Sequence, residues 1–220
     1  VENQSMGGLS IYTDSIHVNL RNPASYGGNN LSISPFNGEG RPVKFAVAGE
    51  LTTVNLETSN QSERTGTTTF DYVVLSIPIG KLGVGFGLLP YTSVGYRLGN
   101  SILINDEEKL KNRYYGEGGL NKTFLGLGYQ INKDLSFGVD VSYNFGTIEN
   151  SAIEFGYDAN GDALSSHSKE FNQSDLSGLS FNFGLSYKPM ITEKLRLTIG
   201  LTYSPKSNLN SRNQRAFSSI

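Results

Sequence analysis

The sequence predicts an all-β protein, a transmembrane antiparallel β-barrel, and two observations carry that prediction. Apolar residues occupy every second position from Leu135 to Phe145, and the alternation returns at Leu179–Tyr187 and Leu195–Tyr203. Successive side chains of a strand point to opposite faces, so each segment has one apolar and one polar face. The polar faces are rich in glycine and serine, which build a poor core. A barrel in lipid needs this arrangement, with apolar side chains outside and a polar lumen.

Composition agrees with strands rather than membrane helices. Only 37% of the 220 residues are hydrophobic, and no stretch approaches the roughly 18 consecutive apolar residues of a spanning helix. The chain contains 26 glycines, 12 tyrosines and 12 phenylalanines, which suit closely packed strands with aromatic side chains near the membrane interfaces. No secretory signal opens the chain, so we expect the signal to have been removed before Val1.

Residues 1–40 do not alternate and are predicted to form a compact irregular segment, distinct from the strands of residues 41–220. Turn signals such as Gly27-Gly28-Asn29-Asn30 and Ser34-Pro35 interrupt this region. It also contains more apolar residues than a solvated tail would carry. A disordered N-terminal tail is the alternative.

Seven strand-like segments follow this region. They are Val43–Leu56, Thr67–Ile79, Leu82–Leu98, Arg113–Ile131, Leu135–Phe155, a sixth strand from about residue 174 to Pro189, and Leu195–Tyr203. The C-terminal stretch from Arg215 to Ile220 is polar, and no strand is predicted there.

The connections alternate in length. Gly80-Lys81, residues 132–134 and residues 189–194 are short, whereas the loops near residues 60, 105 and 165 are long. Outer-membrane barrels have short periplasmic turns and longer extracellular loops, so the short turns should be periplasmic. Because bacterial barrels have even strand numbers, seven strands indicate the front part of a longer barrel. A complete eight-stranded barrel that recruits part of residues 30–45 is the alternative.

Two short elements near the N-terminus resemble a known family. Ser5-Met6-Gly7-Gly8-Leu9 and, further along, Asn22-Pro23-Ala24 resemble the start of the FadL/TodX outer-membrane transport proteins. Phe70–Tyr96 is similar to the early barrel strands of that family. The lysine-rich turns and asparagine-rich loops also resemble those of Bacteroidetes proteins.

The resemblance implies a 14-stranded barrel, of which these strands are half, with the N-terminal segment folded into the lumen as a hatch. It further implies uptake of hydrophobic small molecules such as long-chain fatty acids, released sideways into the bilayer. The residues expected to form the hatch or line its ligand pocket are Met6, Gly7, Gly8, Leu9, Ile11, Asn22, Pro23 and Ala24.

Four residues within the strands attract attention. Asp140 and Arg196 are charged and lie on the polar faces of their segments. A charge facing lipid at mid-depth costs about 2–4 kcal/mol, so both should face the lumen. Pro78 and Pro90 are candidates for a local opening in the wall, because proline removes a hydrogen bond from a strand ladder.

No catalytic or metal chemistry is predicted. The chain has no cysteine, and its two histidines, His17 and His167, lie far apart. Asp158-Ala159-Asn160-Gly161-Asp162 begins like a calcium loop but has its glycine in the wrong position. We therefore expect no metal, no cofactor and no enzyme. With a net charge of −2 and no basic stripe, nucleic acid is not an expected partner either.

The sequence is compatible with three functions for a protein of the bacterial outer membrane. The leading one is an uptake channel for hydrophobic small molecules, with membrane lipid and such a ligand as partners. The rival is a structural or accessory barrel of an outer-membrane assembly or secretion complex, with other outer-membrane proteins as partners. An enzymatic barrel is the third, and would use a serine beside His167. Bound lipid in the lumen would favour the channel, and a complex stable in detergent would favour the accessory subunit.

Overall fold

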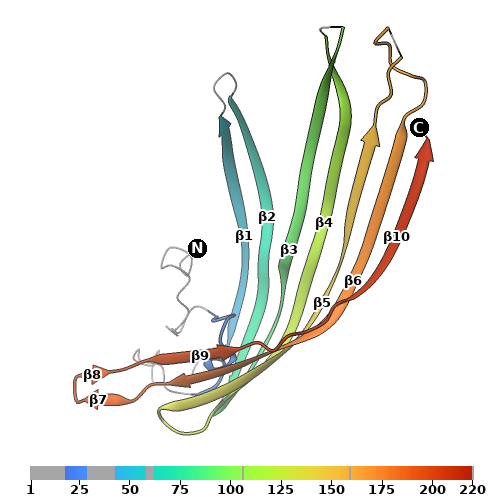
Figure 1. Ribbon diagram of the computed structural model, residues 1–220. Coiled ribbons are helices and arrows are strands. Elements are labelled where there is room, and N and C mark those ends of the chain that lie inside the picture. Colours follow the sequence, from blue (N-terminus) through green and yellow to red (C-terminus); the bar gives the residue numbers. More distant parts are fainter. Residues whose placement is uncertain (1–17, 29–42, 58–61, 106, 159, 220) are drawn as a thin grey trace. The chain divides into compact units, whose positions relative to one another are not determined.

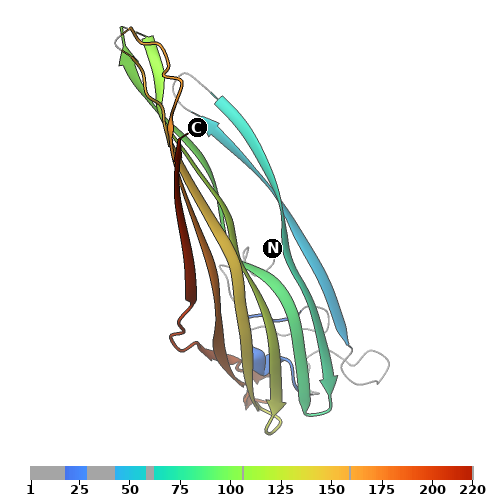
Figure 2. The ribbon, with the colours of Figure 1, turned by 90° about the vertical axis from the view of Figure 1, so that its right-hand side faces the viewer.

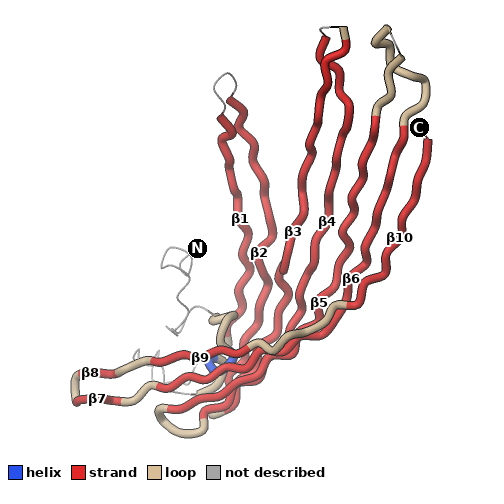
Figure 3. Tube along the Cα trace, in the orientation of Figure 1, coloured by secondary structure: helices blue, strands red, loops and turns tan. Residues whose placement is uncertain are grey.

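The computed structural model describes residues 18–28, 43–57, 62–105, 107–158 and 160–219, and most of these residues are in strands (Figure 1). The helical element in the described ranges is a single 3-10 turn, η1 (Pro23–Ser25), and the rest is strand or loop (Figure 3). An all-β fold is therefore confirmed. Within the described residues, no helix is long and apolar enough to cross a membrane.

Long antiparallel strands make up an eight-stranded sheet. Its members are β1 (Lys44–Glu57), β2 (Ser62–Ile79), β3 (Leu82–Ile104), β4 (Glu107–Gln130), β5 (Leu135–Glu154), β6 (Ser168–Tyr187), β9 (Ile199–Tyr203) and β10 (Asn210–Ser219). The order is β1-β2-β3-β4-β5-β6-β10, so strands that follow one another along the chain from β1 to β6 are neighbours. β6 pairs with β9 near its C-terminal end and with β10 near its N-terminal end. A separate hairpin contains β7 (Met190–Thr192) and β8 (Leu195–Arg196).

The chain divides into two compact units, each built from several stretches of sequence. Unit 1 contains Val1–Leu89, Lys122–Tyr143 and Leu179–Ser207, and unit 2 contains Pro90–Asn121, Asn144–Gly178 and Asn208–Ile220. The long strands β3 to β6 contribute residues to both units.

In unit 1 the alternation read from the sequence corresponds to two different faces of the sheet. Along β5, Phe137, Val141 and Tyr143 are exposed, whereas Asp140 and Ser142 are buried. The same exposure of large apolar side chains recurs on the other strands of the unit, at Phe45, Val47, Phe86, Leu125, Leu127, Leu185 and Leu201. An apolar face left in contact with solvent across several strands is the pattern of a surface that meets lipid.

In unit 2 the strand segments carry mainly polar and charged side chains. Glu107 and Lys109 form an ion pair of 2.6 Å at the start of β4, and Arg215 on β10 pairs with Glu170 on β6 at 2.8 Å. The guanidinium of Arg113 lies near two aromatic rings, 6.0 Å from the centre of the Tyr115 ring and 5.6 Å from that of Phe155. This part of the sheet is therefore held largely by its backbone ladder and by polar contacts.

The structure differs from the predicted strands in three places. The C-terminal stretch, expected to be irregular, forms β10 and pairs with β6 from Asn210↔Ser177 to Ser219↔Ser168. The predicted strand at Leu195–Tyr203 is interrupted between β8 and β9. β3, β4 and β6 also extend into residues that were expected to be long loops. At β10 and in the extensions of β3, β4 and β6, polar sequence without alternation hides a strand, because the ladder uses backbone groups and needs no apolar face.

Candidate functional site

The main candidate site is the buried face of unit 1, where residues 18–28 dock against the sheet. These residues are called the docked segment. η1, drawn in blue in Figures 1 and 2, lies in both views beside the end of the strands that carries the β2–β3 and β4–β5 turns. Pro23, Ala24 and Tyr26 of the docked segment are almost completely buried.

Glycines make this close approach possible. Six of them, from four strands, lie directly under the docked segment and are called the glycine face: Gly83, Gly85, Gly126, Gly128, Gly138 and Gly184. A Cβ atom on Gly85 would lie 2.8 Å from the ring of Tyr26, and one on Gly128 would lie 2.6 Å from the carbonyl oxygen of Pro23. On Gly83 and Gly138 it would meet the backbone of the docked segment itself. At Gly83, Gly128 and Gly138 the segment therefore rests on the sheet backbone to backbone, and at Gly85, Gly126 and Gly184 its side chains lie directly on the strand.

The docked segment is shaped by its own polar side chains. Asn22 caps η1 through its Oδ1, which accepts from the Ala24 N–H at 3.0 Å, and Pro23 occupies the first position of the turn. The Oδ1 of Asn19 accepts from the N–H groups of Arg21 and Asn22 at 3.0 and 3.2 Å. The Ser25 hydroxyl donates to the Asn22 carbonyl at 2.7 Å. These bonds fix the turn before it meets the sheet.

Two asparagines tie the docked segment to β6. The Asn22 amide donates to the Leu185 carbonyl at 3.1 Å, and the Asn182 amide donates to the Arg21 carbonyl at 3.1 Å. Asn182 also lies within 3.3 Å of Asp140 Oδ2 on β5, and its own Oδ1 accepts from the Ser204 hydroxyl at 3.0 Å. The amides of Asn22 and Asn182 are thus paired with backbone or with other side chains, as buried polar groups usually are, whereas Asp140 Oδ1 has no hydrogen-bond partner in the described part of the chain.

A small aromatic core lies beside this polar network. Tyr26 is only 1% exposed and stacks on Phe124, with the ring centroids 6.5 Å apart, and both pack on Val74. Burial, reinforced by the nearby charge of Asp140, raises the pKa of the Tyr26 phenol far above its ordinary value. Tyr26 therefore stays a neutral, protonated phenol under physiological conditions.

The residues predicted from the sequence are placed as follows. Asn22, Pro23 and Ala24 belong to the docked segment, and Asp140 lies on the same buried face. Met6, Gly7, Gly8, Leu9 and Ile11 lie outside the described residues. Arg196 is on β8, away from the eight-stranded sheet, with its Nε 3.3 Å from the sulfur of Met190.

The two prolines singled out from the sequence occupy different positions in β2 and β3. The β2–β3 ladder passes through Pro78, which pairs with Gly83, without a shift of register. Pro90 lies two residues beyond Leu88, the last β3 residue of that ladder.

Sequence reasoning missed Tyr26, Asn182 and the glycine face as parts of one site. The signal available was the run of glycines at alternate positions, Gly83, Gly85 and Gly87. A row of alternating glycines indicates that another backbone lies against the strand.

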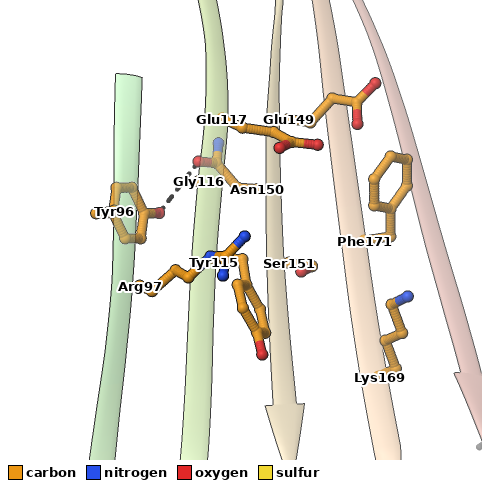
Figure 4. A pocket seen from close by; sticks show the side chains of 10 residues that line it. All are labelled: Tyr96, Arg97, Tyr115, Gly116, Glu117, Glu149, Asn150, Ser151, Lys169 and Phe171. Carbon is orange, nitrogen blue, oxygen red and sulfur yellow. Dashed lines mark hydrogen bonds between the residues drawn. The ribbon is translucent and has the colours of Figure 1, made fainter. Parts of the chain in front are cut away.

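A second candidate site is a groove in unit 2 (Figure 4). It encloses about 240 Å³ and is lined by Tyr96, Arg97, Tyr115, Gly116, Glu117, Glu149, Asn150, Ser151, Lys169 and Phe171. These residues come from four neighbouring strands, β3 to β6. The Tyr96 hydroxyl donates to Asn150 Oδ1 at 3.1 Å across β4, which carries only Gly116 at this point, and the Arg97 guanidinium lies 5.8 Å from the centre of the Tyr115 ring.

The antiparallel sheet, with a continuous apolar face exposed in unit 1 and a polar buried face opposite it, defines a β-rich outer-membrane protein. A family model described as BamG matches residues 1–220, so the chain belongs to the BamG family. The BamG family is associated with the assembly machinery of the bacterial outer membrane. The outer membrane is also the location expected from the sequence. No curated protein and no solved structure matches the chain.

The family match corrects the resemblance drawn from the sequence. Assignment to FadL/TodX is wrong, because the family model that covers the chain is BamG. The misleading elements, Gly7-Gly8 and Asn22-Pro23-Ala24, are short and made of residues that are common wherever turns are needed. The count of fourteen strands and the fatty-acid substrate rest on that resemblance alone and lose their basis with it.

Proposed function

We propose that the chain is an accessory, non-enzymatic subunit of a complex that assembles proteins into the outer membrane. The single observation that carries this proposal is the BamG match over residues 1–220. Other outer-membrane proteins are then its partners, which agrees with the accessory-subunit alternative predicted from the sequence. The sheet serves as barrel wall, and the docked segment lies on the lumen side of that wall.

The packing of the buried face supports a bracing role for the docked segment rather than a ligand pocket. Backbone lies on backbone at Gly83 and Gly138, which leaves no room for a ligand between segment and sheet. The neighbouring side chains Asn22, Asp140 and Asn182 are polar and bonded to one another or to backbone. A hydrophobic small molecule would need an apolar cavity at this place.

The absence of enzymatic activity is part of the proposal. His167 packs against the Phe155 ring, with ring centroids 4.9 Å apart, and its Nδ1 has no hydrogen-bond partner in the described part of the chain. A serine nucleophile needs a base within hydrogen-bond reach and a third group to orient that base. In the described part of the chain, no group accepts or donates a hydrogen bond at His167 Nδ1 and so orients the ring as a base.

Purification from native membranes in a mild detergent tests the proposal. A tagged copy should be recovered in a stoichiometric complex with other outer-membrane proteins, and the complex should survive gel filtration. Recovery of the folded protein alone, with fatty acid or another hydrophobic molecule bound, would contradict the accessory role and favour a channel.

A further inference from the structure

The groove of unit 2 collects four charged side chains that do not neutralise one another. Arg97 and Lys169 are cationic, and Glu117 and Glu149 are anionic. None of the four forms an ion pair with another residue that the structure describes. Elsewhere in the same unit, opposite charges do meet, as in Glu107–Lys109 and Glu170–Arg215.

The two signs of charge are separated along the strands. In Figure 4 the carboxylates of Glu117 and Glu149 lie toward one end of the groove, and the side chains of Arg97 and Lys169 lie toward the other. A ligand that carries one positive and one negative group at a suitable spacing would satisfy both ends. Complementary charge of this kind selects a partner and fixes its register.

The walls between the charged ends are aromatic and partly fixed before any ligand arrives. Tyr96 is held by its hydrogen bond to Asn150, and Arg97 is held over the ring of Tyr115. Tyrosine, phenylalanine and arginine are the side chains enriched at protein interfaces, and side chains that are already ordered lose less entropy on binding. Tyr96, Tyr115, Phe171 and Arg97 give the groove this composition.

The size of the groove favours a protein segment over a small free ligand. Pockets that enclose drug-sized ligands usually span about 300–1,000 Å³. This groove encloses about 240 Å³ and is lined by ten residues spread across β3 to β6. It can accept one or two side chains of a polypeptide that continues outside it.

We infer that the groove docks a short segment of a partner protein, with a basic side chain toward Glu117 and Glu149 and an acidic one toward Arg97 and Lys169. This inference rests on the proposed function, because it takes the partner from the assembly complex. It adds the surface that is used and the charge pattern of the segment bound there.

Photocrosslinking in cells tests the inference with the full-length protein. The photoreactive amino acid p-benzoylphenylalanine replaces Ser151, a residue that lines the groove. Two variants reverse one end each: Glu117→Lys with Glu149→Lys, and Arg97→Glu with Lys169→Glu. The matched control exchanges a pair outside the groove, Glu107→Lys with Lys109→Glu. Heat-modifiable migration on gels verifies that every variant is folded.

One protein should crosslink at position 151, and each charge reversal should lower the yield at least about tenfold, while the control exchange leaves it unchanged. Persistence of the crosslink in both reversals would overturn the inference. So would a crosslink to lipopolysaccharide instead of protein, or none at all in a complex that still co-purifies. Failure of co-purification itself would instead remove the proposed function on which the inference rests.

Discussion

At the scale of residues, the buried face of unit 1 depends on glycines, which have no side chain, as much as on the side chains that form hydrogen bonds. Glycine at positions 83, 138 and 184 lets the backbone of the docked segment approach the strands. Asn22 and Asn182 then use their amides to bond backbone carbonyls on the opposite element. Each of these contacts joins residues more than 150 positions apart in the chain.

Gly138→Ala should displace the docked segment. The new Cβ would meet the backbone of Pro23 and Ala24, and crowding of this kind in packed interiors costs about 1–3 kcal/mol. The native chain has no cysteine, so Ala24→Cys gives a single reporter at a position that is 2% exposed. We expect this cysteine to resist a thiol reagent in the native background and to react in the Gly138→Ala background. Gly95→Ala is the control, because a Cβ there meets nothing within 4 Å.

Tyr26 predicts a pH dependence at alkaline pH. Its pKa is raised above the ordinary value of 10.0, so the folded protein holds the phenolic proton more tightly than the unfolded chain does. The resulting stabilisation is complete below about pH 10 and is lost as the pH rises toward the folded-state pKa. Denaturant midpoints measured from about pH 8 to pH 11 should therefore fall less steeply for Tyr26→Phe than for the native protein. Tyr203→Phe, at a side chain that is 65% exposed, should follow the native curve.

At the scale of elements, strands with strict alternation could be predicted and polar strands could not. The alternation predicts a strand at Leu135–Phe155, and β5 is observed at Leu135–Glu154, because its apolar and polar faces differ sharply. β10, with the sequence Asn-Ser-Arg-Asn-Gln-Arg-Ala-Phe-Ser-Ser, is exposed along its whole length and has no such contrast. Its position is set by its backbone pairing with β6, which no local pattern reveals.

The candidate site shows the same division. Asn22, Pro23 and Ala24 could be singled out because an Asn-Pro step marks a turn locally. Tyr26 and Asn182 could not, because their roles depend on contacts made by the folded sheet. Tyr26 meets Phe124, and Asn182 meets Arg21, across separations that a single sequence does not disclose.

Val141→Arg tests the exposed apolar face of β5. Val141 is 40% exposed beside the buried residues Asp140 and Ser142. If this face meets hydrocarbon near mid-depth, an arginine should destabilise the protein by about 2–4 kcal/mol. Reversible unfolding in lipid vesicles measures the loss. Asn213→Arg on the polar strand β10 should cost little, and an equal loss from both variants would mean that Val141 does not face lipid.

At the scale of the whole molecule, the fold alone does not choose between a channel and an accessory subunit. A sheet with one apolar face suits either, since one architecture hosts unrelated functions. The family match across residues 1–220 favours the accessory role, and the polar, closely packed buried face gives a hydrophobic ligand no place in the described site. Under the proposed function, the two exposed surfaces have separate tasks: the apolar face of unit 1 would contact lipid, and the groove of unit 2 would contact a partner.

Depletion of the protein from its native cells tests the assembly role most directly. The quantity to measure is the fraction of newly made outer-membrane proteins that reach the folded, heat-modifiable state within a fixed time. The account predicts that this fraction falls for several unrelated outer-membrane proteins, and that the native protein restores it on re-expression. Unchanged folding of those proteins, together with a specific loss of uptake of a hydrophobic compound, would contradict it.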